Sequence, residues 1–407
     1  MDVMAPVVLV GGGHAAAAFS NSVRRAGYEG RVVLVSDEPV PPYHRPPLSK
    51  KYLADGLPVE QILIRAPAWY DEQKIELRLG QRAVSVDREA HRLQLANGEA
   101  LDYSRLVLMT GSRPRRLPAA IGGDLQGVLL MRSLADADAL GPHLVAGRRL
   151  LVVGGGYIGL EAAAVAVGKG LQVTLLEAAP RILQRVAAPA TADYFRALHR
   201  SHGVDLREGA GLRQLLADGG RVCGAELDDG SRIEADVVLV GIGVLPNVEL
   251  AQAAGLEVDN GIVVDALCQS SDPHILAAGD CCSFDYQGRR IRLESVQNAN
   301  DQAATAAHTV AGQPKPYAAL PWFWSDQYDC KLQIAGLNSG YDQAVVRPGK
   351  TARSRSVWYY REGRLLAVDA MADAAAFVTA KKLLERGASV PPEQASDPAS
   401  EFRTWGL

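Results

Sequence analysis

The sequence predicts a mixed α/β fold that contains two similar βαβ units and ends in a smaller α+β region. The first supporting observation is a weak internal repeat: residues 6–38, PVVLVGGGHAAAAFSNSVRRAGYEGRVVLVSDE, match the pattern of residues 148–180, RRLLVVGGGYIGLEAAAVAVGKGLQVTLLEAAP. The second is a change in the pattern of apolar and turn residues from about Pro321. There, short alternating segments with turn residues, such as SVWYYREGRLLAVDA, indicate strands, and ADAAAFVTAKKLLERG indicates a helix.

Each copy of the repeat has the pattern of a strand, a glycine-rich turn, an alanine-rich helix and a second strand that closes on an acid. This order is typical of a Rossmann-like unit, whose parallel sheet is buried. The runs LVLMTGSRP, DVVLVGIGVLPN and ILAAGD are expected to be further strands. The last residues, 391–407, carry no clear pattern and are expected to form a tail.

The two turns have the spacing of a phosphate-binding loop. A first glycine permits the tight turn, a second lets backbone approach a pyrophosphate, and a third small residue lets the helix pack against the strand. A single such turn is weak evidence, but here the strand–turn–helix context is correct twice. The sequence therefore predicts two dinucleotide sites, with Gly11, Gly13 and Ala16 in the first and Gly154, Gly156 and Gly159 in the second.

The acids that close the two repeats, Asp37 and Glu177, are expected to accept hydrogen bonds from an adenosine ribose. A 2′-phosphate about 4 Å from Glu177 would be repelled by roughly 4 kcal/mol per charge pair at an effective dielectric constant of 20. This favours NADH over NADPH, although Arg181 and Arg185 follow closely and would offset part of the repulsion.

Composition excludes several classes of function. The chain has 407 residues, of which 48% are hydrophobic and 22% charged, and its net charge is −3. That charge provides no field that would recruit nucleic acid or an anionic membrane, and no apolar run reaches the roughly 18 residues of a membrane span. The N-terminus runs directly into the first apolar stretch, so we expect no signal peptide and a cytoplasmic location.

The five cysteines indicate no metal or disulfide chemistry. None is part of a CxxC pair or of a Cys/His cluster with ligand spacing, so no metal site is expected. Adjacent Cys281 and Cys282 are either redox-active or small buried thiols, and we favour the second interpretation.

Several motifs resemble those of known flavoproteins. TGSRP, GIGVLPN and SSDPHILAAGD, beside the two turns, resemble the flavoproteins with two dinucleotide-binding domains. More narrowly, PPYHRPPLSK (41–50), GGGYIGLE (154–161), LESVQNA (293–299) and PWFWSDQY (321–328) resemble the NADH-dependent ferredoxin reductases. The resemblance covers nearly the entire chain, and the last two motifs are the specific ones.

The resemblance implies a glutathione-reductase-like arrangement of two nested Rossmann-like domains plus a C-terminal α+β domain. Residues 1–113 and 240–318 would form a discontinuous FAD-binding domain, residues 114–239 the NAD-binding domain and residues 319–407 the C-terminal domain. The cofactors would be FAD and NADH.

Site residues are implied position by position. Those matched to FAD are Gly11, Gly13, His14, Ala15, Ala16, Asp37, Arg45, Lys50, Ala83, Thr110, Gly111, Arg132, Asp280, Val296 and Trp324. Those matched to NADH are Gly154, Gly156, Tyr157, Ile158, Gly159, Glu161, Glu177, Gly241 and Ile242. His14 would either touch the pyrophosphate or be a partly exposed histidine at a helix start.

Lys50 and Glu161 are the residues expected to tune the reaction, with no covalent nucleophile. A cation near the flavin would stabilise its reduced form, and Glu161 would lie near the nicotinamide. We hypothesise that the two side chains form an ion pair. Without the PPLSK context, Lys50 would be taken for an ordinary surface lysine.

The implied partner is a small [2Fe–2S] ferredoxin that serves a cytochrome P450 or a Rieske-type oxygenase. Such ferredoxins are usually acidic, so a basic docking patch is expected. Candidates are Arg65, Lys381 and Lys382, with the segment Arg347–Arg355 behind them, although a solvated charged face explains these residues equally well.

Other flavoprotein functions remain as alternatives. Disulfide reductases carry CxxxxC or CxxC, and NADH peroxidases carry a cysteine where this chain has Tyr43 and His44. The absent nucleophile disfavours both. A flavoprotein similar to apoptosis-inducing factor, with an interaction role, or a thiol-independent NADH oxidase would be compatible with the cofactor sites.

Overall fold

The structure is a computed structural model that describes residues 5–405. By its internal contacts the chain divides into two compact units. The first unit comprises Met1–Arg45, Leu57–Arg113 and Val244–Ala319, and the second comprises Pro46–Gly56, Pro114–Gly243 and Leu320–Leu407. The short segment 46–56, which contains the PPLSK motif, therefore belongs to the second unit. The three domain boundaries expected from the sequence stay a prediction.

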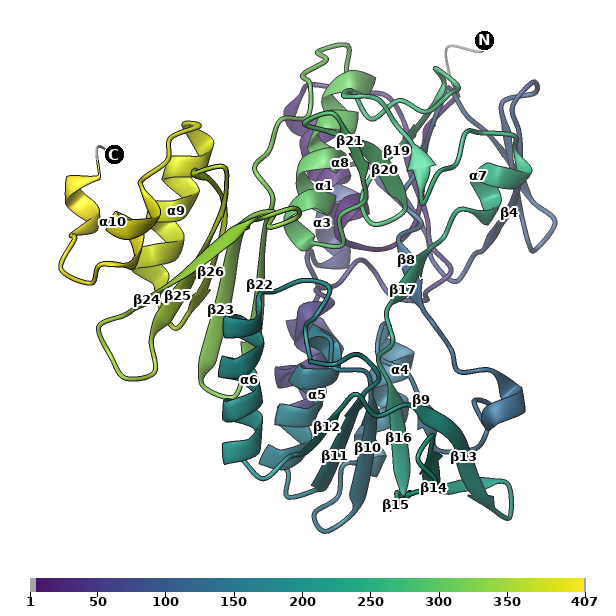
Figure 1. The fold of residues 1–407 in the computed structure, drawn as a ribbon. Helices are drawn as coiled ribbons and strands as arrows, with labels where there is room; N and C mark the ends of the chain where they lie inside the picture. The colour runs from purple at the N-terminus through teal and green to yellow at the C-terminus, as the bar shows by residue number, and fades with distance from the viewer. Residues whose placement is uncertain (1–4, 406–407) are drawn as a thin grey trace. The chain divides into compact units, whose positions relative to one another are not determined.

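The first unit is built on the parallel sheet predicted from the first repeat (Figure 1). Its strands are ordered β19-β7-β1-β2-β3, with bounds β1 Val7–Val10, β2 Val32–Val35, β3 Ile75–Arg78, β7 Arg105–Leu108 and β19 Ile275–Ala277. The VVLV sequences of β1 and β2 are buried along their whole length, as a sheet covered on both faces requires. On one face pack α1 (His14–Arg25), α3 (Pro67–Glu72) and α8 (Val296–Val310).

Smaller elements complete the first unit. The antiparallel sheet of β4 (Ala83–Asp87), β5 (Arg92–Leu95) and β6 (Ala100–Asp102) covers the other face with α7 (Glu249–Ala253) and the sheet of β18 (Ile262–Val263), β20 (Cys282–Tyr286) and β21 (Arg289–Ile291). The remaining elements are η2 (Val59–Gln61) and the paired strands β8 (Ser112–Pro114) and β17 (Val244–Pro246).

The second unit contains the second Rossmann-like sheet. Its strands are ordered β12-β11-β10-β16-β9, with bounds β9 Val128–Leu129, β10 Arg149–Val153, β11 Gln172–Glu177, β12 Asp205–Glu208 and β16 Val237–Val240. Around this sheet lie α4 (Leu134–Leu140), α5 (Tyr157–Gly168), α6 (Pro189–Ser201) and the antiparallel sheet β13 (Leu212–Asp218), β14 (Arg221–Leu227) and β15 (Arg232–Glu234). The same unit holds η1 (Pro46–Ser49), α2 (Lys51–Asp55), η3 (Ala119–Ile121) and η4 (Gly141–His143).

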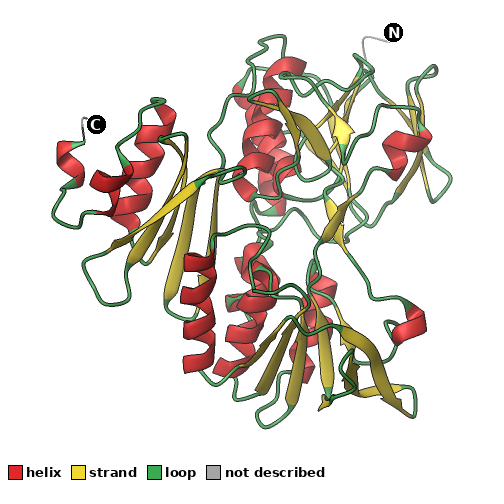
Figure 2. Ribbon diagram, viewed as in Figure 1, coloured by secondary structure: helices red, strands yellow, loops and turns green. Residues whose placement is uncertain are grey.

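A five-stranded antiparallel sheet forms the C-terminal part of the second unit, as the alternating segments predicted. Its order is β22-β23-β26-β25-β24, with bounds β22 Trp322–Gln327, β23 Cys330–Gly336, β24 Gln343–Pro348, β25 Arg355–Arg361 and β26 Arg364–Met371. Figure 2 shows α9 (Ala374–Glu385) and α10 (Pro392–Ser396) on one face of this sheet.

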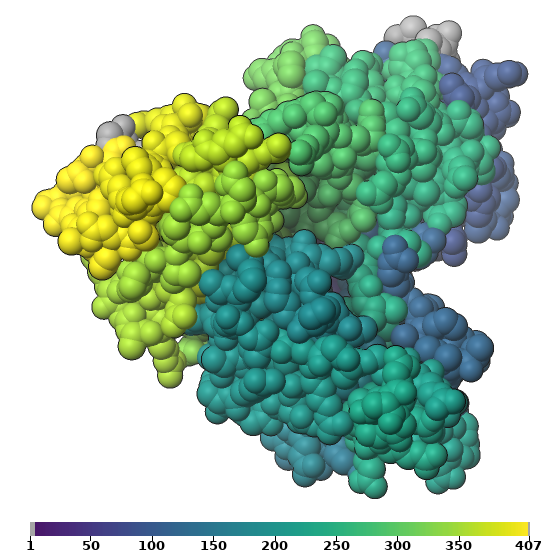
Figure 3. All heavy atoms as spheres, viewed as in Figure 1, coloured from purple at the N-terminus to yellow at the C-terminus, as the bar shows by residue number. Residues whose placement is uncertain are grey.

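The expected tail is instead folded over most of its length. α10 contacts β24 and β25, and the chain then continues into η5 (Phe402–Thr404), which contacts α9. In the space-filling view the yellow C-terminal residues form one packed body (Figure 3). Trp405 is only 6% exposed and packs edge-on against Trp358. Arg347 holds the segment in place by donating to the carbonyl oxygens of Ala395, Asp397, Pro398 and Ser400. Among the helices that the structure describes, none has the length and apolar character needed to cross a membrane.

Candidate active site

The first glycine turn has the geometry of a phosphate cradle. Gly11 has φ of +130°, and a Cβ there would lie 2.1 Å from the carbonyl oxygen of Met109, so only glycine fits. At Gly13, the N-cap of α1, a Cβ would come no closer than 3.9 Å to Arg45 Nε. No side chain within residues 5–405 caps the α1 N-terminus. The backbone amide groups of this uncapped helix start and the open space at Gly13 fit a pyrophosphate.

The second turn repeats this geometry at the start of α5. A Cβ on Gly154 would lie 2.4 Å from Gly241 O, and one on Gly159 would lie 2.2 Å from Gly154 O. A Cβ on Gly156, the N-cap, would meet no described atom within 4 Å. By contrast, Ser133, Ser295 and Asp373 cap α4, α8 and α9 with their side chains. Ile158, next along α5, is 44% exposed and offers an apolar surface to a ligand.

The two acids occupy different positions relative to their turns. Glu177 accepts hydrogen bonds from the backbone N–H groups of Gly155 (2.8 Å) and Ala179 (2.7 Å). Gly154 N–H donates to Leu176 O, whereas Gly11 N–H donates to Val35 O. Ser36 is therefore the register equivalent of Glu177. Asp37 lies one residue further on, with an exposed side chain.

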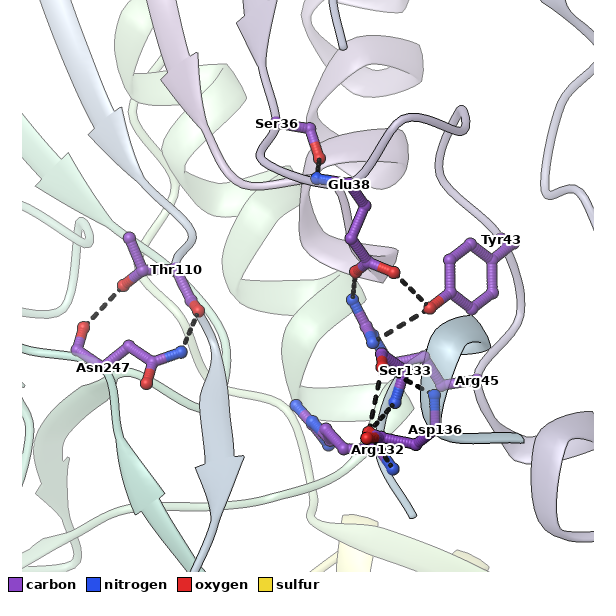
Figure 4. Close-up of polar contacts among 9 residues, drawn as sticks. All are labelled: Ser36, Glu38, Tyr43, Arg45, Thr110, Arg132, Ser133, Asp136 and Asn247. Atoms are coloured by element: carbon purple, nitrogen blue, oxygen red, sulfur yellow. Dashed lines mark hydrogen bonds and ion pairs between the residues drawn. The ribbon is translucent and has the colours of Figure 1, made fainter. Parts of the chain in front are cut away.

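Glu38, the next residue, is engaged within the first unit. Its carboxylate accepts hydrogen bonds from Arg45 Nη2 and from the hydroxyl of Tyr43, as Figure 4 shows. Arg45 also contacts the open side of Gly13, so the chain brings this predicted residue to the first cradle. His14 is 8% exposed, and its ring lies 5.4 Å from that of His44. The partly exposed histidine considered for this position is therefore wrong.

Other predicted FAD residues of the first unit lie on strand ends and helix starts. Thr110 exchanges two hydrogen bonds with Asn247: its hydroxyl donates to Asn247 O, and its carbonyl accepts from the Asn247 side-chain amide (Figure 4). The Asp280 carboxylate accepts from the Ser112 hydroxyl at 3.0 Å. Val296 is the first residue of α8, Ala83 opens β4, and Gly111 follows Thr110.

Three predicted FAD residues belong to the second unit: Lys50, which is described with its partner below, Arg132 and Trp324. The backbone N–H of Arg132 donates to Asp136, which also forms a capping box with Ser133 at the start of α4 (Figure 4). Trp324 lies on β22, half-buried, with its ring 5.6 Å from that of Trp322.

Lys50 and Glu161 form the hypothesised ion pair. Lys50 Nζ lies 2.9 Å from Glu161 Oε1, and the side chains are only 17% and 3% exposed. The prediction of the pairing is confirmed, and an ordinary surface lysine is excluded. Glu161 lies in the second turn of α5, and Lys50 directly precedes α2.

Two serines hold the same carboxylate and were missed by sequence reasoning. Ser49 donates to Glu161 Oε2 at 2.7 Å, and Ser325 donates to Oε1 at 2.7 Å. Both serines are buried. The alternation within WFWSDQ of β22, which turns Ser325 away from Trp324, is the sequence signal that would have indicated its inward position.

Comparison with known proteins identifies the family. A family model described as pyridine nucleotide-disulphide oxidoreductase matches residues 5–303, more than half of the chain, and a second, described as reductase C-terminal, matches residues 322–405. The chain belongs to the pyridine nucleotide-disulphide oxidoreductase family.

Individual relatives match this oxidoreductase over nearly its full length. Putidaredoxin reductase from Pseudomonas putida is 43% identical over 397 residues, covering 96% of this chain and 94% of that protein. The ferredoxin–NAD(+) reductase component of an anthranilate 1,2-dioxygenase system from Burkholderia cepacia is 43% identical over 407 residues, covering 98% and 99%. A chain in the crystal structure of the covalent putidaredoxin reductase–putidaredoxin complex matches with a TM-score of 0.95 and 41% identity, covering 98% and 97%. The expected fold class and the resemblance to ferredoxin reductases are confirmed.

All five cysteines of the oxidoreductase are free thiols. Cys281 and Cys282 are 0% exposed, with their sulfur atoms 3.9 Å apart. Burial raises the pKa of the Cys282 thiol well above its ordinary value, and Cys281 adds to the shift. The hydrogen bond with Cys282 lowers the pKa of the Cys281 thiol, but neither sulfur is accessible. An inaccessible thiol is a poor nucleophile, which agrees with the interpretation of small buried thiols.

The expected docking residues divide into exposed and buried ones. Arg65, in the first unit, is exposed beside Trp69, and Lys382, in the second, is also exposed. Lys381 lies over the Trp322 ring at 5.7 Å. Arg347 is only 6% exposed and is occupied by the C-terminal carbonyl groups described above. Its expected place in a docking patch is therefore wrong, because a buried arginine cannot present its charge to a partner.

Proposed function

We propose that this oxidoreductase takes electrons from NADH and passes them through FAD, one at a time, to a small [2Fe–2S] ferredoxin. The ferredoxin would serve a cytochrome P450 or a Rieske-type oxygenase. The observation that carries the proposal is the buried Lys50–Glu161 pair, whose carboxylate belongs to α5, the helix of one of two open phosphate cradles. The names of the full-length relatives support the ferredoxin as partner.

The two cofactors are assigned to the two cradles. The turn at Gly11 and Gly13, with Asp37 and Asp280, would hold FAD. The turn at Gly154 and Gly156, with Glu177, would hold NADH. When bound, FAD supplies the step between the two-electron chemistry of NADH and the one-electron chemistry of an iron–sulfur cluster.

The protein's own contribution is to position and to balance charge. Lys50 places a cation in a largely dry site, where it favours negative charge nearby more strongly than it would in water. Glu161 keeps that cation oriented. Ser49 and Ser325 donate to the same carboxylate, one to each oxygen, and these hydrogen bonds hold the pair in one geometry.

The choice of NADH over NADPH rests on Glu177. Its carboxylate is fixed by two backbone N–H groups at the end of β11. A 2′-phosphate beside a fixed carboxylate would be repelled, because the carboxylate cannot rotate away without losing those bonds.

Docking of an acidic ferredoxin is assigned to the half-buried Lys381 and the exposed Lys382 of α9, and Arg65 in the first unit stays a separate candidate. The proposal also includes a cytoplasmic location, where thiols such as Cys281 and Cys282 stay reduced.

Two measurements test the proposal. The first is the rate of flavin reduction on anaerobic mixing with NADH, and the second is cytochrome c reduction with a panel of [2Fe–2S] ferredoxins. We expect rapid flavin reduction by NADH, much slower reduction by NADPH, and cytochrome c reduction that requires a ferredoxin. Turnover that needs only oxygen would favour an NADH oxidase. Slow turnover with a persistent charge-transfer complex would favour an interaction role.

A matched pair of variants tests docking. Lys381→Ala is expected to raise the KM for ferredoxin several-fold at low ionic strength, with flavin reduction by NADH unchanged. Lys169→Ala, at the far end of α5, removes the same charge and should leave both quantities unchanged.

A further inference from the structure

The inward face of β22 carries a line of buried polar side chains that extends from Ser325 to residues that the proposed function does not use. Ser325 and Gln327 are both 0% exposed and point to the same side of the strand, opposite to Trp324. Gln327 Oε1 lies 2.9 Å from Nε2 of His199, a fully buried residue of α6. His199 Nδ1 in turn lies 3.2 Å from the hydroxyl of Tyr328.

The direction of every hydrogen bond in this line follows from its inner end. Glu161 is paired with Lys50 and can only accept, so the single hydroxyl proton of Ser325 must go to Glu161 Oε1. Ser325 Oγ must then accept from Gln327, which places Nε2 of that amide toward it, at 3.2 Å.

The directions of the hydrogen bonds in the outer half of the line follow from the same reasoning. With the Gln327 amide nitrogen facing Ser325, its oxygen faces His199, so His199 must carry its proton on Nε2. Nδ1 is then an acceptor and takes the Tyr328 hydroxyl proton. All donors point the same way, from Tyr328 at the outer end to the carboxylate.

His199 is neutral under ordinary conditions, as this arrangement requires. Its burial lowers its pKa to about 4, more than the hydrogen bond with Gln327 raises it. His202 stacks on the Tyr328 ring at 3.7 Å and is exposed, so the line ends near solvent. Because a glutamine amide does not readily exchange protons along such a line, the line holds atoms in place and does not conduct protons.

We propose that Ser325, Gln327 and His199 are positioning residues that fix the Glu161 carboxylate for its pair with Lys50, so that α6 and the C-terminal sheet set the rate of hydride transfer from NADH. This inference rests on the proposed function of Lys50 and Glu161. Aligned hydrogen bonds in a dry interior strengthen one another, so an interruption at any member weakens the hold on the carboxylate.

The first test measures the tautomer and the protonation state of His199 directly by NMR. In protein labelled with ¹⁵N-histidine, the His199 signals are assigned by their loss in His199→Gln. We expect the Nε2–H tautomer, with no change from pH 6 to pH 9. A proton on Nδ1, or titration near pH 6.5, would overturn the proposal. This readout needs neither NADH nor ferredoxin, so it stays valid if the proposed function fails.

The second test separates positioning from binding. In Ser325→Ala we expect flavin reduction at saturating NADH to slow about tenfold, the size of one hydrogen bond to a charged group, and in Gln327→Met by several-fold. The dissociation constant of NADH should change less than twofold in both. An unchanged rate in Ser325→Ala, or a loss confined to NADH affinity, would refute the proposal.

Matched variants show whether the slower flavin reduction is caused by loss of these hydrogen bonds. Ser283 is also 0% exposed, and its hydroxyl has no hydrogen-bond partner among residues 5–405. Ser283→Ala should therefore leave the rate unchanged. His199→Gln restores an N–H donor near the Nε2 position and should reduce flavin faster than His199→Met. Equal rates in these two variants, at equal FAD content, would show that the hydrogen bond is irrelevant.

Discussion

The buried carboxyl group of Asp369 leads to a prediction of how the free energy of unfolding depends on pH. This residue of β26 is 0% exposed. Its Oδ2 accepts hydrogen bonds from the hydroxyls of Thr191, at 2.7 Å, and Tyr359, while Oδ1 has no hydrogen-bond partner in the described chain. Burial raises the pKa of this carboxyl from its ordinary 3.8 to about 6, against the smaller effect of the two hydroxyls.

A raised pKa makes stability fall as pH rises. The folded state binds the Asp369 proton more tightly than the unfolded state, so the full contribution is present below about pH 3.8 and is lost as pH passes 6. With one pKa unit equal to about 1.4 kcal/mol, the total is about 3 kcal/mol. The part lost between pH 5 and pH 8 is about 1.4 kcal/mol.

Asp369→Asn removes this titration and keeps an oxygen acceptor for both hydroxyls. The free energy of unfolding is measured by urea denaturation at pH 5 and pH 8 for both proteins. Wild type should lose about 1.4 kcal/mol more than the variant between the two pH values. Because the change between pH 5 and pH 8 is compared between the two proteins, the contributions of the other titrating groups cancel. Any pH-independent effect of the amide on the free energy of unfolding cancels as well. Parallel pH dependences would refute the assignment of a raised pKa to Asp369.

Three further predictions concern the cradle, the ion pair and the C-terminal segment. Gly156→Ala should fold normally and bind NADH at least tenfold more weakly by calorimetry, whereas Gly154→Ala should destabilise the fold, because its Cβ would meet a carbonyl oxygen at 2.4 Å. Glu161→Ala should slow flavin reduction by NADH in stopped-flow experiments with FAD content unchanged, and an unchanged rate would remove Glu161 from the mechanism. Arg347→Ala should lower the free energy of unfolding by about 2–4 kcal/mol through carbonyl groups left unpaired, while the exposed Arg364→Ala should change it by less than about 0.5 kcal/mol.

Local chemistry explains which features the sequence predicted. The two cradles depend on glycines within a few residues of one another, and a Cβ clash at Gly11 or Gly154 is a property of one turn. The buried strands of β1 and β2 show in the VVLV runs for the same reason. The Lys50–Glu161 pair was expected only through the resemblance of PPLSK and GGGYIGLE to known reductases, because no local rule joins residues so far apart.

The tertiary structure decided the features that depend on distant partners. Ser325 is 164 residues from Glu161, and His199 is 128 residues from Gln327, so no spacing in the chain reveals the line that they form. The same holds for Arg347, which the sequence presents as a surface cation and which the fold buries under residues 395–400. Turn geometry and strand burial are encoded over a few residues. The partner of a buried polar group is chosen only when packing excludes water and leaves each donor one acceptor within reach.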